Sequence, residues 1–239
     1  MEANGDDVDS YRIANMHYNF GWVGNDVVTI EYKKGKIVKR NGGGGPSFPA
    51  GFFDPGVYET VTYNSNQAVL VKATTTPGYT FNPNEKRFIF NGNKIDQCII
   101  LDGSTGLVDT IKYAYSGESI ISKTTYHKGI RSRSDFYYTA SGNLDSIVTR
   151  YAEVNPVTIQ YGIDPNDLRR DKEIFENYDT YPNPTNKLVI FDETFNRSLS
   201  KNNYRTYTKL KFNKLGEDNL LERRFWTFVY ENGKINLAK

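Results

Sequence analysis

The fold is decided by residues 107–151, which read LVDTIKYAYSGESIISKTTYHKGIRSRSDFYYTASGNLDSIVTRY. β-Branched and aromatic residues form short runs here, and the runs are separated by Ser116-Gly117-Glu118, Lys128-Gly129 and Ser141-Gly142. Such residues suit a pleated, half-buried surface, and each glycine can adopt the positive φ of a tight hairpin. We therefore predict four consecutive antiparallel strands, at Leu107–Tyr115, Ser119–His127, Ile130–Thr139 and Asn143–Tyr151.

The same period of two residues extends over most of the chain and indicates strands rather than helices. No change in composition resembles a linker, so we expect one β-rich domain over residues 11–239 after a flexible tether at residues 1–10. The predicted fold class is mainly β, a long antiparallel meander of eleven or more strands. We expect this meander to curl into an open barrel or a layered sheet, because flat open sheets of that size are uncommon.

One short helix is expected after residue 164. Asp164 can cap it, Pro165 suits its first position, and an apolar stripe continues to about Asn177. A second helical turn is predicted over Glu193–Leu199, after a strand at Leu188–Phe191. The glycine-rich segment from Asn41 is predicted to open a mobile loop that runs to Pro55.

Composition excludes several classes of protein. The 239 residues include 30 Lys and Arg against 28 Asp and Glu, so a net charge of +2 produces no overall field for nucleic acid or membrane. A single cysteine excludes an internal disulfide framework and a zinc cluster built on cysteine. Two histidines exclude a site with three histidine ligands. We predict no cofactor and no metal site.

Candidate reactive groups have simpler structural explanations. Cys98 lies in an apolar run, which predicts a buried and unreactive thiol. His127 ends a strand, and the basic residues Lys123, Lys128, Arg131 and Arg133 near it could bind anionic groups or simply protect strand edges. The carboxylates show no local motif that selects a catalytic pair; they include Asp96, Asp102, Asp109, Asp135, Asp145, Asp192 and Glu193.

The first ten residues contain neither a basic segment nor an apolar one, so they do not form a signal peptide. No apolar run approaches the ~18 residues that span a bilayer. Two expectations remain open at this point. The protein is cytoplasmic with an acidic start, or it is exported after removal of a signal segment that preceded residue 1.

Two segments together form a more specific pattern. They are Glu176-Asn177-Tyr178-Asp179-Thr180-Tyr181-Pro182-Asn183-Pro184 and Leu199-Ser200-Lys201-Asn202-Asn203. With the preceding hairpins, which look like tyrosine–aspartate (YD) repeats, this pattern resembles an uncharacterised Bacteroidetes family of predicted lipoproteins. The resemblance covers roughly Leu107–Lys239. It implies a porin-like or open-barrel β-meander and a periplasmic or cell-surface location, and it carries over no catalytic residue. The lipid-attachment cysteine of such proteins is absent, since Cys98 lies in the middle of the chain.

The motif itself has a structural explanation. A residue before proline favours extended or turn geometry, and asparagine side chains can cap backbone groups. We therefore expect a corner that stabilises the fold, with a ligand site as the alternative. Its residues are Tyr178, Asp179, Asn183, Pro184, Asn202 and Asn203.

Three functions remain open. The first is a non-catalytic module that binds glycan or another cell-envelope partner, because tyrosine combines a stacking face with a hydroxyl. The tyrosines expected to contact such a ligand are Tyr113, Tyr115, Tyr126, Tyr137 and Tyr138. The second is a structural protein that assembles through its sheet edges. The third is a glycoside-processing enzyme. Nucleic acid is not expected as a partner, and membrane only through a lipid anchor outside this chain.

Overall fold

One antiparallel sheet dominates the computed structural model, which describes residues 15–17, 27–44, 53–102, 106–127, 129–154, 161–164, 166–231 and 234–237. Its fourteen described strands pair in chain order. They are β1 (Asn15–His17), β2 (Val27–Lys33), β3 (Lys36–Gly44), β4 (Phe53–Tyr63), β5 (Gln67–Thr74), β6 (Glu85–Asn91), β7 (Lys94–Asp102), β8 (Gly106–Ser116), β9 (Ser119–Tyr126), β10 (Ile130–Tyr138), β11 (Leu144–Tyr151), β14 (Arg170–Glu176), β15 (Thr206–Phe212) and β16 (Asp218–Phe225).

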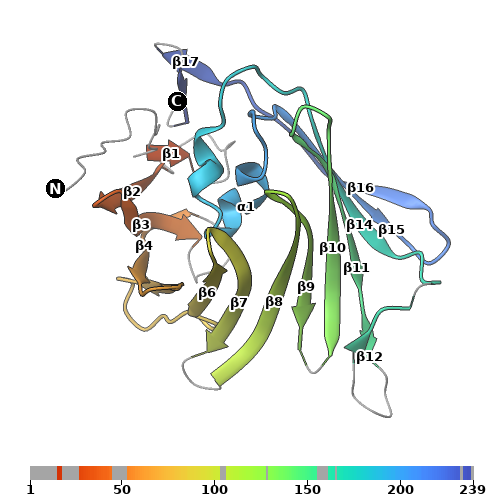
Figure 1. Ribbon diagram of the computed structural model, residues 1–239, viewed down its shortest axis with the longest axis horizontal. Coiled ribbons are helices and arrows are strands. Elements are labelled where there is room, and N and C mark those ends of the chain that lie inside the picture. Colours follow the sequence, from red (N-terminus) through yellow and green to blue (C-terminus); the bar gives the residue numbers. More distant parts are fainter. Residues whose placement is uncertain are drawn as a thin grey trace.

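The sheet curls around two short helical segments without closing (Figure 1). β1 and β16 lie at the two ends of the strand order, and no pairing joins them within the described residues. Two separate hairpins complete the β structure, β12 (Glu153–Val154) with β13 (Tyr161–Gly162) and β17 (Val229–Glu231) with β18 (Lys234–Asn236). The prediction of a long, open antiparallel meander is confirmed. Residues 1–10, expected to form a tether, lie outside the described residues.

The hairpins that decided the prediction form as expected. β8 to β11 begin and end within one residue of the predicted bounds. Gly117 and Gly142 have φ values of 56° and 83°, which explains why glycine occupies both turns. Tyr113 pairs with Lys123, and Phe136 pairs with Ile147, so these side chains share the concave face of the sheet.

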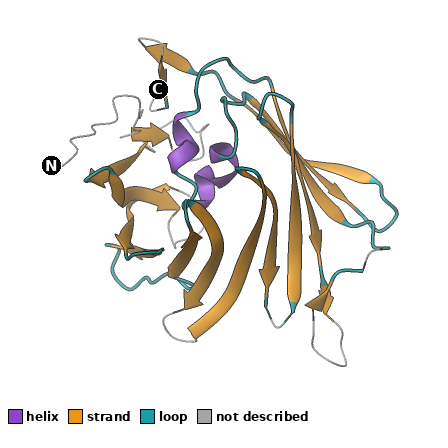
Figure 2. Cartoon of the chain, in the orientation of Figure 1, coloured by secondary structure: helices purple, strands orange, loops and turns teal. Residues whose placement is uncertain are grey.

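The core lies on this concave face, between the sheet and the segment that crosses it. That segment contains the 3₁₀ helix η2 (Pro184–Lys187) and the α-helix α1 (Asp192–Ser198), shown in purple in Figure 2. Leu188 and Phe191 pack from it into an apolar cluster with β2 to β7. Phe195 of α1 joins a second cluster with Phe136 and Phe175. The predicted helical turn at Glu193–Leu199 therefore corresponds to α1.

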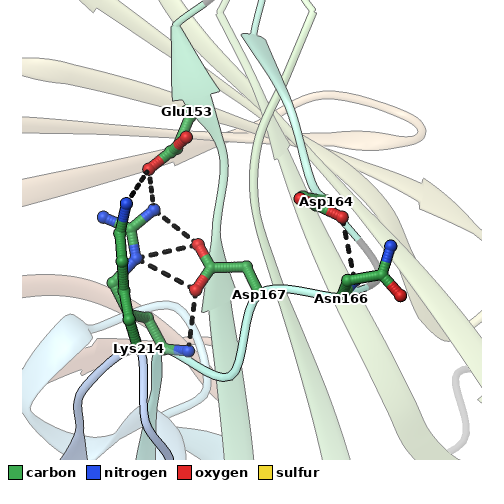
Figure 3. Close-up of polar contacts among 6 residues, drawn as sticks. Glu153, Asp164, Asn166, Asp167 and Lys214 are labelled. Carbon is green, nitrogen blue, oxygen red and sulfur yellow. Dashed lines mark hydrogen bonds and ion pairs between the residues drawn. The ribbon is translucent and has the colours of Figure 1, made fainter.

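The helix expected over residues 164–177 is wrong, because β14 occupies Arg170–Glu176. Asp164, predicted to cap a helix, caps a turn instead. Its carboxylate accepts a hydrogen bond from the Asn166 backbone N–H at 2.8 Å (Figure 3). Asp167 accepts from the Arg169 side chain at 2.8 Å, and Arg169 also pairs with Glu153. Tertiary pairing of β14 with β11 and β15 then outweighs the weak local helical preference.

The strand expected at Leu188–Phe191 is also wrong. These residues connect η2 to α1 without pairing to a strand, and Leu188, Ile190 and Phe191 are buried. An apolar run of four residues fits a buried connection as well as a strand, and periodicity cannot separate the two.

The glycines predicted to begin a mobile loop belong to β3 instead. Gly43 pairs with Asp54, and Gly44 pairs with Phe53. A Cβ on Gly42 would lie 2.8 Å from the Phe53 ring, and one on Gly43 would lie 3.0 Å from the Arg40 guanidinium. Glycine is therefore needed here because side chains cover the strand closely. Residues 45–52 of the predicted loop lie outside the described residues.

Candidate functional site

Helix α1 brings two acids to the basic concave face of the sheet. Asp192 pairs with Lys86 of β6, and a Glu193 carboxylate oxygen lies 3.6 Å from the guanidinium of Arg40 of β3. Arg40 is fully buried and also donates to Glu59 of β4 at 3.2 Å. Burial and the nearby Glu193 raise the pKa of Glu59, against the effect of Arg40. The interior of the curl is thus held by charged contacts as well as apolar packing.

The predicted corner residues meet in one hydrogen-bonded unit. The Asn183 side chain donates to the carbonyls of Arg197 at 2.6 Å and Ser200 at 2.9 Å, and it accepts from the Thr185 backbone at 2.9 Å. Asn183 is buried and caps η2, in which Pro184 occupies the first turn. The Asn183 side chain thus connects the start of η2 to the end of α1, and Pro184 lies next to it.

The other corner residues join the same unit from both sides. The Asp179 carboxylate accepts from the Asn203 backbone at 3.1 Å and from the Tyr230 hydroxyl at 2.5 Å. The Asn202 side chain donates to the Tyr181 carbonyl at 2.9 Å, and the Tyr178 hydroxyl donates to the Leu144 carbonyl. These contacts tie the crossing segment to the β10–β11 turn and to the C-terminal hairpin.

Arg197 lies behind this corner and is almost completely buried. Its guanidinium carbon lies 3.8 Å from the centre of the Tyr204 ring and 4.9 Å from that of Trp226, and Nη1 donates to the Tyr204 carbonyl at 3.1 Å. Burial lowers the pKa of Arg197, although the surrounding tyrosines oppose this shift. A cation enclosed by aromatic rings stabilises this part of the fold.

The five tyrosines expected to contact a ligand do not form one surface. Tyr115 and Tyr138 line a cavity of about 260 Å³, hereafter the hairpin cavity, together with Lys94, Glu118 and Asn186. Both tyrosine hydroxyls already donate to backbone carbonyls, at 3.0 and 2.9 Å. Their hydroxyls therefore stabilise the hairpins and leave mainly ring faces for a ligand.

The other three tyrosines lie elsewhere. Tyr113 packs against Phe195 with ring centres 6.0 Å apart, and burial raises its pKa well above the usual value. Tyr126 lies on the convex face, where Lys112 Nζ is 5.7 Å from the centre of its ring. Tyr137 is 49% exposed on the same convex face. The structure thus separates the five into a buried ring, a pair at the hairpin cavity and two convex-face residues.

A second cavity, of about 170 Å³, lies between α1 and the last strands of the sheet. We call it the acidic cavity. It is lined by the aromatic residues Phe175, Tyr204, Tyr207 and Trp226 and by the polar residues Glu173, Asp192, Glu193, Asn196, Glu222 and Arg224. Sequence analysis missed most of these residues. The one available signal was the alternation of Glu222, Arg224 and Trp226, which places them on one face of an extended segment.

Contacts inside the acidic cavity engage most of its polar groups, including Arg224, which pairs with Glu222. Glu173 accepts from the Tyr207 hydroxyl at 3.0 Å and from Asn196 at 3.1 Å through a single carboxylate oxygen. Within the described residues, no cationic side chain forms an ion pair with Glu173. The Trp226 indole N–H is buried and has no hydrogen-bond partner in the described part of the chain. A buried indole N–H normally has an acceptor, so Trp226 holds an unsatisfied donor beside this cavity within the described residues.

The basic run around His127 is divided between the two faces. Lys123 points to the concave side, 5.0 Å from the Phe195 ring centre, and burial lowers its pKa. Arg131 pairs with the buried Asp109 at 3.1 Å, and the exposed Arg133 pairs with Asp135 at 2.9 Å. His127 ends β9 with Nδ1 2.6 Å from the Val108 carbonyl. The run therefore forms no single anion site from its described members, and Lys128 lies outside them.

Cys98 is buried in the core, and desolvation raises its pKa to about 12. The thiol is then almost entirely protonated at pH 8, and the thiolate is the reactive form. We expect the folded protein to react at least ~100-fold more slowly with a disulfide reagent than the protein in denaturant. The reaction rate of the folded and of the denatured protein is measured from the chromophore that the reagent releases, by absorbance at 412 nm, or from the mass shift of the modified chain. Equal rates would contradict an inert, buried thiol.

Two findings concern metal and membrane. In the described ranges, no three His, Cys, Asp or Glu side chains are grouped so that they could hold a metal ion. Those ranges also contain no helix with the length and apolar character that crossing a membrane requires.

Comparison with known proteins identifies relatives in structure only. No family model matches the sequence, and no curated protein matches it. A porin-like protein from Bacteroides vulgatus ATCC 8482 superposes with a TM-score of 0.53 at 11% identity, over 94% of this chain and 90% of that one. The chain shares its fold with porin-like proteins from Bacteroides. A second such protein, from Bacteroides uniformis ATCC 8492, has a TM-score of 0.51 at 12% identity, over 87% of this chain and 80% of that one.

These comparisons confirm the porin-like meander that the sequence resemblance implied. At such identities the likeness concerns the fold alone. The lipoprotein and the repeat parts of the resemblance stay predictions.

Proposed function

We propose that this protein is a non-catalytic binding module of the bacterial cell envelope, and that it holds a glycan in the acidic cavity. The composition of that cavity carries the proposal. Aromatic rings offer faces on which a sugar can stack, while carboxylate, amide and guanidinium groups form hydrogen bonds with its hydroxyls. Glu173, Trp226 and Arg224 supply these groups on one wall.

The size and position of the cavity limit the ligand. A volume of about 170 Å³ is smaller than the cavities that enclose drug-sized molecules, which run to ~300–1,000 Å³. It suits one sugar unit at the end of a longer chain that continues into solvent. An envelope location for the protein rests on the likeness to porin-like Bacteroides proteins and on the sequence resemblance.

Binding of soluble oligosaccharides, measured by calorimetry and thermal shift, tests the proposal. We expect one glycan class to raise the melting temperature, because a ligand at about 100 times its Kd adds about 2.7 kcal/mol to stability. Glu173→Gln removes the carboxylate charge and one acceptor oxygen, and Trp226→Phe removes the indole N–H. Each should weaken binding about tenfold, equal to about 1.4 kcal/mol.

The matched control is Tyr137→Phe, which changes an exposed ring on the convex face and should leave binding unchanged. Binding that persists in both cavity variants would place the ligand elsewhere, with the hairpin cavity next to be tested through Asn186→Ala. Absence of binding across neutral, acidic and amino-sugar oligosaccharides would contradict the glycan proposal. Products of hydrolysis in the same samples would favour a glycoside-processing enzyme.

A further inference from the structure

Among the described residues, the sheet ends in the long strand β16, which has one unpaired edge. β16 pairs with β15 on one side, and no described residue pairs with it on the other. An unpaired row of backbone donors and acceptors can add a further strand. Natural edge strands limit such pairing with lysine, other charged residues, proline or bulges. Asp218–Phe225 has no lysine or proline, and its four charged residues include both signs, so they can pair with one another across an antiparallel partner.

Exposed apolar side chains gather along this edge. Of the twelve large apolar residues that are exposed in the described chain, four lie within residues 215–225: Leu215, Leu220, Leu221 and Phe225. A fifth, Leu168, packs close to Gly216 in the β15–β16 turn. Leu215 is 77% exposed and Phe225 is 67% exposed, so the edge leaves a large apolar surface in water.

Asp218 and Arg223 carry opposite charges toward the two ends of β16. An antiparallel second copy of the strand therefore places each residue opposite the other. Asp218 pairs with Phe212 and Arg223 pairs with Thr208, and residues four apart on β15 point to one face. Asp218 and Arg223 are five residues apart and would point to opposite faces of a regular strand. A register shift near Leu220 and Leu221 adds one residue to β16, so both side chains lie on the convex face. Both are exposed, and neither forms an ion pair within the described residues.

We infer that β16 pairs antiparallel with β16 of a second copy of this chain, about a two-fold axis between Leu220 and Leu221. In this register each Asp218 lies opposite Arg223 of the other copy, so two opposite-charge pairs form by symmetry. Leu220 and Leu221 meet at the centre and leave water. The contact is isologous and closed, which produces a dimer rather than a filament.

Sedimentation velocity over a concentration series tests this inference on the full chain. The wild-type protein should form a concentration-dependent dimer. Asp218→Arg and Arg223→Asp should each weaken dimerisation about tenfold, because each places like charges opposite one another twice. The double variant restores both charge pairs with reversed sign and should recover dimerisation to within about threefold of the wild type.

Leu221→Lys should weaken the dimer, while the matched Leu107→Lys, at another exposed leucine on β8, should not. Circular dichroism and melting temperature verify that each variant folds. Three results would overturn the inference: a wild-type protein that stays monomeric at millimolar concentration, a dimer insensitive to either charge reversal, or a double variant weaker than both single variants.

Discussion

Replacing Arg197 with alanine is expected to lower the free energy of unfolding by about 3–5 kcal/mol, in line with large-to-small changes in a packed core. The change removes a side chain of which 1% is exposed and leaves a cavity among Tyr204, Trp226 and Phe228. It also leaves the buried Tyr204 carbonyl without its donor. At this chain length the melting temperature should fall by about 2–4 °C for each kcal/mol. Urea unfolding by linear extrapolation measures the free energy directly.

Two further variants give this prediction its controls. Arg133→Ala removes an arginine whose side chain is 54% exposed, and we expect its cost to stay within about 1 kcal/mol. Arg197→Lys keeps the positive charge but loses the planar group that stacks on the rings, so an intermediate cost is expected. If Arg197→Ala costs no more than Arg133→Ala, the enclosed guanidinium does not stabilise the fold.

The second large effect is expected at the corner. Asn183→Ala should lower the free energy of unfolding by about 3 kcal/mol, because it removes several buried hydrogen bonds at about 1 kcal/mol each and leaves their partners unsatisfied. Those partners are the carbonyls of Arg197 and Ser200 and the polar groups of Thr185. Thermal and urea unfolding measure the loss.

Asn186→Ala is the matched control, because Asn186 lies exposed in the same 3₁₀ helix, η2. Its cost should stay within about 0.5 kcal/mol. Asn183→Asp should be at least as harmful as Asn183→Ala, since a carboxylate accepts hydrogen bonds but cannot donate to two carbonyls. Equal stability of the Asn183 and Asn186 variants would contradict a structural role for the corner.

Asn183 and Arg197 differ in how far the local sequence indicates their contacts. The corner residues were singled out from sequence, because asparagine before proline has few local conformations and its amide seeks backbone partners. Arg197 was not singled out. An arginine in a sequence is expected at the surface, and only the rings of Tyr204, Trp226 and Phe228, which approach it from other segments, make its burial favourable.

The residues of the candidate binding sites also divide into those that the sequence indicates and those that only the fold brings together. Tyr115 and Tyr138 were chosen for their residue type, and the structure brings both to the hairpin cavity. The acidic cavity unites α1 with β14, β15, β16 and the residue that follows, so its residues are neighbours only after the sheet curls. Glu173 and Glu222 are far apart in the chain, and no local spacing relates them.

The meander, the bounds of β8 to β11 and the burial of Cys98 follow from local sequence patterns, because period-two patterning and glycine turns act between neighbours along the chain. Contacts between distant segments replace the capped helix by β14, place Gly42, Gly43 and Gly44 in a strand in which Gly43 lies close to buried Arg40, and leave β16 without a second partner strand among the described residues. Each of these outcomes depends on partners distant in the chain, whose contribution to packing and pairing exceeds local conformational preferences of at most ~1 kcal/mol per residue for residues other than proline.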